Sequence, residues 1–358
     1  MNKMGFKPLV FPKDESCHNA VIEWWYFNGH LRTESGREFV FMYCLFKVDP
    51  KKVALPFMEK ISVHDFYFAH SLISDIDKKI FKPFVFLYSE LDKDSFKKER
   101  LFIKAGEDFI FENTKDKEYH FKNTNLDLAL ISKKAPLLIG GKGWIDLGAK
   151  DTYYFSLSDL EAVGKIRTEN GVESVSGKVW MDRQWSDEGY HSEDKWTWFS
   201  IQLENGLDVL CFEYGDKEKT RSATIYLTNG KQIFTRNISF KPLGKTWKSP
   251  ETKAVYELEW LIEIPELNLK IKTVPKNIDQ EIIFGNINYW EGGLSIEAQL
   301  NGQKINGIGF LEMVGVPMHK SLAKIYLEKG RALINDPELL KKYFKEGKEF
   351  VFSQIFRP

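Results

Sequence analysis

The stretch WTWFSIQLENGLDVLCFEYGD, residues 196–216, contains two runs of alternating side chains on either side of an Asn-Gly pair. Successive side chains of a strand point to opposite faces of a sheet, so Trp196, Trp198, Ser200 and Gln202 share one face. The Asn205-Gly206 pair is a strong hairpin signal, because tight hairpin turns favour residues that tolerate positive φ. The stretch therefore predicts two antiparallel strands, and its mixed Trp, Ser and Gln face is typical of a cavity wall.

The same signals recur along the chain. Further Asn-Gly pairs lie at 170–171, 229–230 and 301–302, and strand-like runs lie at 37–48, 64–73, 81–91, 99–106, 108–113 and 118–132. Closely spaced hairpins predict antiparallel sheet, and closure of the sheet into barrels removes exposed edges. A long helical pattern occurs at 321–350, with breaks near Gly330 and Pro337. We expect a mostly β protein with a short C-terminal helical tail.

Composition excludes several classes of function. The chain has 358 residues with 51 basic and 51 acidic side chains, so a nucleic acid is not an expected partner. Its three cysteines are widely spaced, which favours free thiols, and no sequence motif for a metal, a nucleotide or another cofactor is present. No apolar run is long enough to span a membrane. Without a hydrophobic leader before Pro12, we expect a cytoplasmic protein or one whose leader has been removed.

The stretch VIEWWYFNGHL, residues 21–31, carries large aromatic side chains and one polar group on each face. A carboxyl at Glu23 inside a dry aromatic cavity would have a raised pKa and could protonate an alkene. Tryptophan rings could then hold the resulting cation. In the alternative interpretation, Glu23 pairs with Arg183 and stabilises the fold. The sequence leaves both interpretations open.

Six segments in order resemble the family of carotenoid 1,2-hydratase (hydroxyneurosporene synthase) and AttH-like proteins. They are residues 11–31, 64–75, 153–166, 176–186, 196–210 and 287–315. The resemblance implies two lipocalin-like β-barrels in tandem, which we place at 18–188 and 189–320, followed by the helical tail at 321–358. This chain departs from the resemblance at one position. Arg183 follows Trp180-Met181-Asp182, where the hydratases have a histidine.

The resemblance also implies a function. The family includes hydratases that add water to an isolated double bond and relatives that look like cyclases. We therefore expect a cofactor-independent hydratase or cyclase that acts on a large apolar isoprenoid or polyketide-like molecule by proton-initiated chemistry. The alternative is a lipocalin-like carrier that binds a hydrophobic small molecule without changing it. The oligomeric state is left open.

The expected site combines residues from the alternating strands with residues that the resemblance implies. His70 lies in the family-like run FAHS, although a histidine in a core is often only hydrogen-bonded, and Tyr214 resembles a tyrosine of the hydratases. Asp182 and Arg183 are adjacent and face opposite sides of their strand, and either of them could instead form a structural ion pair. His64 and His70 would lie roughly 20 Å apart along a strand, too far to share a metal.

We accordingly predict four catalytic residues, namely Glu23, His70, Asp182 and Tyr214. The predicted substrate-binding residues are Trp24, Trp25, Tyr26, Asn28, His64, Arg183, Trp185, Trp198, Gln202 and Tyr289. We expect Glu23, Trp25, His70, Asp182, Trp185, Trp198 and Tyr214 to converge on one elongated, mostly apolar pocket. Glu291 and Glu312 are expected to satisfy buried backbone or arginine groups, and the alternative is that they line a pocket. No metal or cofactor is expected.

Overall fold

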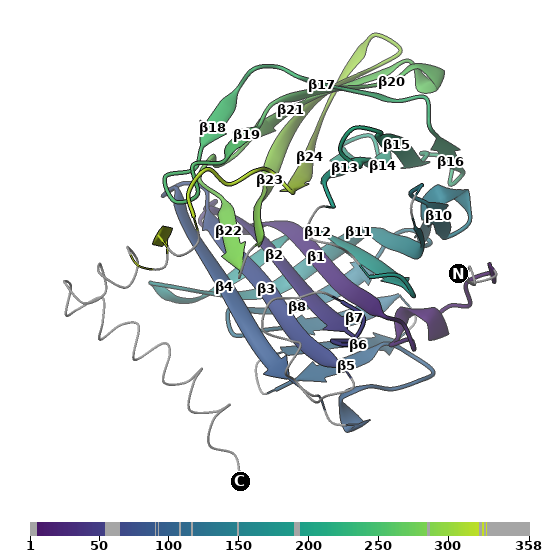
Figure 1. Cartoon of the computed structure of the whole chain (residues 1–358), viewed down its shortest axis with the longest axis vertical. Coiled ribbons are helices and arrows are strands. Elements are labelled where there is room, and N and C mark those ends of the chain that lie inside the picture. The colour runs from purple at the N-terminus through teal and green to yellow at the C-terminus, as the bar shows by residue number, and fades with distance from the viewer. Residues whose placement is uncertain are drawn as a thin grey trace.

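The structure is a computed structural model that describes residues 6–53, 65–89, 91, 93–106, 109–115, 117–148, 150–189, 194–284, 287–321, 324, 325 and 327. The described chain is mostly β-strand, and its strand pairs are antiparallel, which confirms the predicted fold class (Figure 1). The predicted helical tail lies largely outside the described residues. Within the described residues, no helix is long and apolar enough to cross a membrane.

The first half of the chain forms sheet A, which has 12 strands. Its main order is β4 (Ile80–Ser89), β3 (Phe66–Asp75), β2 (Glu38–Val48), β1 (Ile22–Thr33), β12 (Gly171–Ser186), β11 (Asp151–Thr168), β8 (Leu126–Ser132), β7 (Glu118–Lys122), β6 (Phe109–Lys115) and β5 (Phe102–Ala105). The short strands β9 (Leu137–Leu138) and β10 (Trp144–Asp146) pair with β11. Figure 1 shows that this sheet curls strongly around its own interior.

The second half of the chain forms sheet B, which has 10 strands. Its main order is β16 (Gln232–Thr235), β15 (Thr220–Tyr226), β14 (Asp208–Tyr214), β13 (Trp196–Leu203), β24 (Gln303–Val314), β23 (Ile287–Leu300), β21 (Leu269–Pro275), β20 (Trp260–Ile264) and β17 (Ser239–Pro242), and β22 (Glu281–Phe284) pairs with β23. Strands β18 (Thr246–Lys248) and β19 (Val255–Glu257) form a separate hairpin. The 3-10 turns are η1 (Lys13–Glu15), η3 (Lys93–Ser95), η4 (Ile139–Gly141) and η5 (Pro265–Leu267).

All four Asn-Gly pairs lie in tight connections between antiparallel neighbours, as predicted. At Asn301-Gly302 both residues have positive φ, 51° and 82°, as a type I′ turn requires. In the other three pairs only the glycine has positive φ, so these hairpins form without a type I′ turn.

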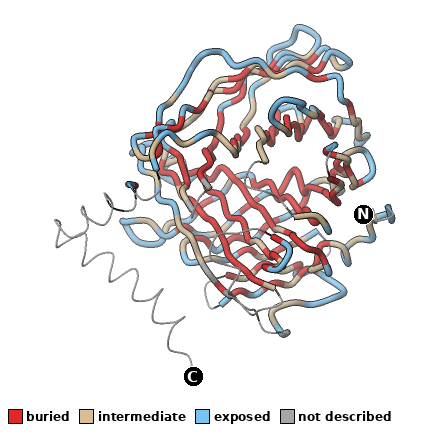
Figure 2. Tube along the Cα trace, in the orientation of Figure 1, coloured by how far each residue is buried: buried red, intermediate tan, exposed pale blue. Residues whose placement is uncertain are grey.

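Three apolar clusters explain the double-sided pattern of residues 21–31. One cluster fills the interior of sheet A, another fills the interior of sheet B, and a third lies between the two sheets. Strand β1 therefore has Trp25 and Phe27 in the first cluster and Tyr26 in the third. Figure 2 shows the resulting buried runs along the central strands. Neither face of β1 meets bulk water, which accounts for its lack of a polar face.

The two sheets approach each other closely at Gly293 of β23. A Cβ atom there would lie 2.7 Å from a methyl group of Val40 and 3.0 Å from the His30 ring, both in sheet A. Glycine is therefore required at this position for close packing. Sheet A ends at Ser186 and sheet B begins at Trp196. The predicted domain boundary at 188/189 falls in this connection and stays a prediction.

Candidate functional site

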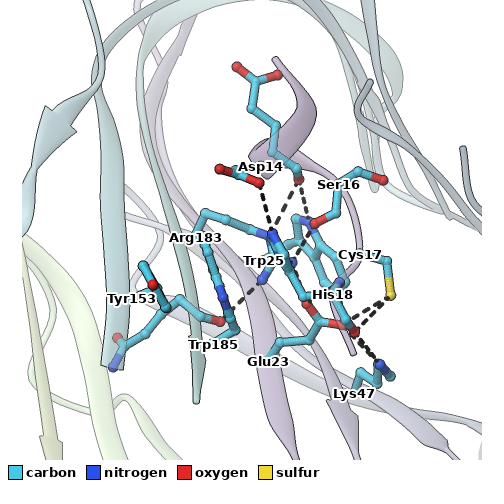
Figure 3. A network of polar contacts seen from close by, with 12 residues as sticks. Asp14, Ser16, Cys17, His18, Glu23, Trp25, Lys47, Tyr153, Arg183 and Trp185 are labelled. Carbon is cyan, nitrogen blue, oxygen red and sulfur yellow. Dashed lines mark hydrogen bonds and ion pairs between the residues drawn. The ribbon is translucent and has the colours of Figure 1, made fainter. Parts of the chain in front are cut away.

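Glu23 lies in a closed polar network inside sheet A (Figure 3). Its side chain is fully buried, and Arg183 Nη2 donates a hydrogen bond to Oε2. The His18 backbone N–H donates to the same oxygen at 3.0 Å. Lys47 Nζ lies 3.2 Å from Oε1, and Cys17 Sγ lies 3.0 Å from it. Both carboxylate oxygens of Glu23 therefore have partners, and two of these partners are cations.

This network fixes the charge of Glu23. Burial alone would raise the pKa of the carboxyl, but Arg183, His18 and Lys47 outweigh burial and hold the pKa well below its usual range. The prediction of a raised pKa for Glu23 is therefore wrong, and the alternative of a pair with Arg183 describes the structure. An ionised carboxylate in this setting has no proton to donate.

Arg183 connects the N-terminal segment to the interior of sheet A. Its guanidinium carbon lies 3.9 Å from the ring centre of Trp25 and 5.0 Å from that of Trp185. Its Nη2 also donates to the backbone carbonyl of Ser16 at 2.6 Å. Arg183 therefore packs against Trp25 and Trp185 inside the protein. These contacts lie on the same face of the strands as Glu23.

A cavity of about 370 Å³ lies between the two sheets, on the other face of β1 and β12. Its wall is mostly apolar and rich in aromatic side chains, namely Trp24, Tyr26, Phe46, Phe68, Tyr154, Trp196, Trp198, Phe212, Tyr214 and Tyr289. The acidic side chains of its wall are Asp182, Asp194, Glu291 and Glu312. Both halves of the chain contribute, so the site is complete only when the two sheets are packed together.

The predicted site residues separate into two groups. The cavity wall contains His70, Asp182, Tyr214, Trp24, Tyr26, Trp198 and Tyr289. It does not contain Glu23, Trp25, Arg183 or Trp185, because strand alternation directs these side chains into the interior of sheet A. Asn28 and Gln202 also lie outside the wall, where they contact Ser200 Oγ at 3.3 Å and the Ser158 carbonyl at 2.6 Å. The predicted convergence on one pocket is corrected accordingly, and His64 lies outside the described residues.

Asp182 is buried at the base of the cavity among three donors. Ser156 Oγ and Trp180 Nε1 each donate to Oδ1 at 2.6 Å, and the Tyr154 hydroxyl donates to Oδ2. Trp198 Nε1 in turn donates to the Tyr154 hydroxyl oxygen at 2.9 Å. Burial raises the pKa of Asp182 to about 7, although these three donors favour its ionised form. Asp182 can therefore change its protonation state near neutral pH.

Glu291 and Glu312 face each other across β23 and β24, and both line the cavity, which is the alternative that the sequence left open for them; neither is among the predicted site residues. The Tyr26 hydroxyl donates to Glu291 Oε1 at 2.6 Å, and Trp196 Nε1 donates to Glu312 Oε1. Neither carboxyl has an arginine partner among the described residues, contrary to the prediction. Glu291 Oε2 is buried and accepts no hydrogen bond in the described part of the chain. Glu312 is partly exposed, but it faces the cavity between atoms of both sheets.

Both carboxyls of the pair have raised pKa values. Burial and the charge of Glu312 raise the pKa of Glu291 well above its usual range. Burial raises the pKa of Glu312 to about 7, with a contribution from Asp182. Like charges directly opposite on neighbouring strands repel, and a proton on one carboxyl converts that repulsion into a hydrogen bond. Strand parity was the signal in the sequence, since Glu291 shares a face with Tyr289, and Glu312 lies opposite Trp198.

His70 and Tyr214 occupy separate parts of the wall. His70 Nδ1 lies 2.5 Å from the Tyr289 hydroxyl, and burial lowers the pKa of the imidazole to about 3, so the ring is neutral. The Tyr214 hydroxyl donates to Asp194 Oδ1 at 2.7 Å, and Lys150 Nζ lies 2.5 Å from the other oxygen of Asp194. Among the described residues no group of three His, Cys, Asp or Glu side chains is arranged to hold a metal ion.

The sequence of this chain matches the AttH-like family over residues 4–316. The chain belongs to the AttH-like family. A curated relative, dehydratase asqC of Emericella nidulans, is 27% identical over 208 residues, which are 54% of this chain. The chain spans only 58% of the length of that relative. The predicted family is thus confirmed at the level of AttH-like proteins.

Solved structures of AttH-like and related proteins share the fold. An AttH protein of Nitrosomonas europaea superposes with a TM-score of 0.75 at 26% identity, covering 87% of this chain and 97% of its own. Kievitone hydratase of Nectria haematococca superposes with a TM-score of 0.69 at 18% identity, covering 86% of this chain and 93% of its own. CghA, solved with Sch210972, gives a TM-score of 0.52 at 11% identity, covering 83% and 89%. The predicted tandem lipocalin-like architecture is confirmed by this likeness.

Proposed function

We propose that this AttH-like protein catalyses the addition or loss of water, or a proton-initiated cyclisation, on a large uncharged apolar molecule held between the two sheets. The observation that carries the proposal is the Glu291–Glu312 pair at the wall of an aromatic cavity. A carboxyl that keeps its proton near neutral pH inside an apolar site is a suitable general acid. No cofactor takes part in the proposed steps.

The chemistry balances with the groups in the cavity. The protonated carboxyl of the pair gives its proton to one alkene carbon, which leaves a carbocation on the other carbon. Water attacks the cation, a C–O bond forms, and the extra proton of that water returns to the carboxylate. Loss of water is the same sequence in reverse. In a cyclisation a second alkene of the substrate attacks the cation in place of water, a C–C bond forms, and the new cation loses a proton from a neighbouring carbon to the carboxylate. The faces of Trp196, Trp198 and Tyr26 can hold the positive charge of the intermediate.

The other predicted catalytic residues take positioning roles in this proposal. Asp182 accepts hydrogen bonds from three side chains, so it holds Tyr154 in place and is less free than Glu291 to reach a substrate. Neutral His70 orients the Tyr289 hydroxyl. Arg183 stands where the hydratases have a histidine, but its side chain lies on the face of its strand that points away from the cavity. This difference therefore does not change the groups that line the cavity. A reaction like that of carotenoid 1,2-hydratase therefore stays within the proposal.

Two kinds of relatives support enzymatic activity. One curated relative is named a dehydratase, and a structural neighbour is a hydratase. The addition and the removal of water share one transition state, so one cavity suits both names. A carrier without chemistry would need the aromatic wall, but it would have no use for a proton shared by two facing carboxyls.

The proposal is tested by incubating the protein with linear terpenoids, polyenes and tertiary terpenoid alcohols and searching for a mass change of one water or for an isomer. We expect Glu291→Gln and Glu312→Gln to lower turnover by roughly 100-fold or more, because the shape is kept and the acid is lost. Glu297→Gln is the matched control, since Glu297 lies on the same strand but is exposed. Binding without any product in the unaltered protein would make the protein a carrier.

A further inference from the structure

The ionisable side chains of the cavity wall include several acids and no lysine or arginine among the described residues. Three of these acids are Asp182, Glu291 and Glu312. The one histidine there, His70, is neutral. The fourth acid of the wall, Asp194, is compensated by Lys150. Three carboxyls therefore face the same space without a cation from the described part of the chain.

Two buried carboxyls elsewhere in the molecule have cations beside them. Glu23 has Arg183 and Lys47 within ion-pair distance, and Asp208 has Lys134 Nζ at 2.5 Å. A third, Glu281, accepts hydrogen bonds from the hydroxyls of Ser249, Thr252 and Tyr256 instead. A carboxylate buried without a cation or such donors is costly. In the cavity, the place of that cation is open to a ligand.

One acceptor in the wall has no donor. Glu291 is 1% exposed, and its Oε2 accepts no hydrogen bond within the described residues, whereas Oε1 accepts one from Tyr26. Aromatic side chains line the same cavity, and Tyr26, which donates to Oε1, packs edge-on against Trp198 at 5.3 Å between ring centres. A protonated amine can donate its N–H to the carboxylate while its alkyl carbons contact the rings. A fatty acid would instead bring its own negative charge next to these carboxyls, and no cation among the described residues of the wall would offset it.

We propose that the cavity binds apolar amines in their protonated form, with the nitrogen on Glu291 and Glu312, and that it rejects apolar anions. The inference rests on the proposed function in one respect, namely that such an amine occupies the place of the carbocation in the reaction and inhibits it. Substrates of the site are then uncharged molecules, or molecules with a basic nitrogen near the reacting carbon.

Amine binding also has a pH dependence of known sign. The ammonium favours ionised carboxyls, so amine affinity should rise as the pH rises through about 7, where Glu312 loses its proton. The titratable groups that line the cavity with the pair are Tyr26 of β1, Cys44 of β2, His70 of β3, Tyr154 of β11, Asp182 of β12, Asp194, Tyr214 of β14 and Tyr289 of β23. Burial raises the pKa values of Tyr26, Cys44, Tyr154 and Tyr289, so these side chains stay neutral in this range.

The test compares three ligands of equal chain length: decyldimethylamine, decanol and decanoate. Binding is followed through the fluorescence of the tryptophans in the cavity wall. At pH 8 we expect the amine to bind about 10-fold more tightly than decanol, and decanoate about 10-fold more weakly. Glu291→Gln and Glu312→Gln should each remove most of the preference for the amine over decanol. Glu297→Gln serves as the exposed control on the same strand.

The outcomes separate this inference from the proposed function. Equal affinity for amine and decanol, or an amine preference that survives in both Gln variants, overturns the amine site even if the protein turns over neutral substrates. Amine preference without any turnover supports the amine site and leaves a carrier as the function. Competitive inhibition of turnover by the amine, lost in the same two variants, supports both.

Discussion

Glu23 and Glu291 are both buried on inner strands, one in each sheet, but their pKa values shift in opposite directions. Glu23 has two cations and several N–H and S–H donors, whereas Glu291 has a tyrosine hydroxyl and a second carboxyl. Burial is the same for both, so it cannot decide the protonation state. The neighbouring charged and polar groups decide the protonation state of each carboxyl. The polar groups inside sheet A are paired with one another, whereas the carboxyls between the sheets line a cavity that can hold a ligand.

Asp208 is an intermediate case in this comparison. It has one cation, Lys134, at 2.5 Å, together with the Ser158 hydroxyl at 2.8 Å. Burial raises its pKa to about 6, despite Lys134. Glu312, with no cation among the described residues, is raised to about 7. The number of nearby cations thus orders these carboxyls from a permanently ionised group to a group that can act as an acid.

The largest expected effect comes from removing the cation of the closed site. Arg183→Met should lower the free energy of unfolding by about 3–5 kcal/mol, because a buried carboxylate loses its main partner. Chemical denaturation at pH 7 measures this. Glu23→Gln should also destabilise, and the double variant should recover part of the loss, which a double-mutant cycle quantifies. Additive effects of the two substitutions would show that the pair is not coupled and would contradict the comparison.

The sequence predicted the strands and hairpins well, because alternation and Asn-Gly pairs act locally. It also predicted correctly that Asp182 and Arg183 face opposite sides of one strand, and Asp182 is in the cavity wall while Arg183 is not. It could not assign the faces of residues 21–31, because both faces are buried, one inside sheet A and one between the sheets. The predicted site therefore includes residues of both faces, such as Glu23 and Tyr26, although only the face of Tyr26 lines the cavity. The Glu291–Glu312 pair depends on a contact between strands and on packing of the second sheet.

A smaller effect is expected where one cation holds one carboxyl. Lys134→Met should lower the free energy of unfolding by about 2 kcal/mol at pH 8 and raise the pKa of Asp208 further, because the remaining Ser158 hydrogen bond does not neutralise the charge. Carbon-13 NMR titration of the carboxyl measures the pKa. Lys133→Met is the control, since Lys133 is exposed and pairs with Glu161 on the surface. An unchanged pKa of Asp208 would mean that Lys134 has no influence on it.

The two regions should also differ in how pH affects stability. Between the ordinary value of 4.5 and about 7, folded Glu312 holds a proton that the unfolded chain has released. Stability should therefore fall with rising pH by about 1.4 kcal/mol per unit for this group, and Glu312→Gln should remove that slope. Glu23 has the opposite sign, since its lowered pKa gives stability above 4.5 that is lost in acid. Urea denaturation at several pH values compares the variants, and an identical slope in Glu312→Gln would contradict the raised pKa.

The smallest effect should come from a single hydrogen bond between the sheets. Trp198 on sheet B donates to the Tyr154 hydroxyl, which donates to Asp182 on sheet A. Trp198→Phe keeps an aromatic wall but removes the donor, which should cost about 1 kcal/mol of stability. Without that donor the Tyr154 hydroxyl is a weaker donor to Asp182, so the pKa of Asp182 should rise further.

The control for this variant is Trp247→Phe, because Trp247 lies on the separate hairpin and stacks on Tyr256. The carboxyl titration of Asp182 and the denaturation midpoint are measured for both variants. A pKa of Asp182 that moves equally in both would show that the Trp198 donor does not act through Tyr154. A shift in Trp198→Phe alone would show that sheet B adjusts the acidity of a carboxyl on sheet A, which places part of the control of the cavity in the contact between the two sheets.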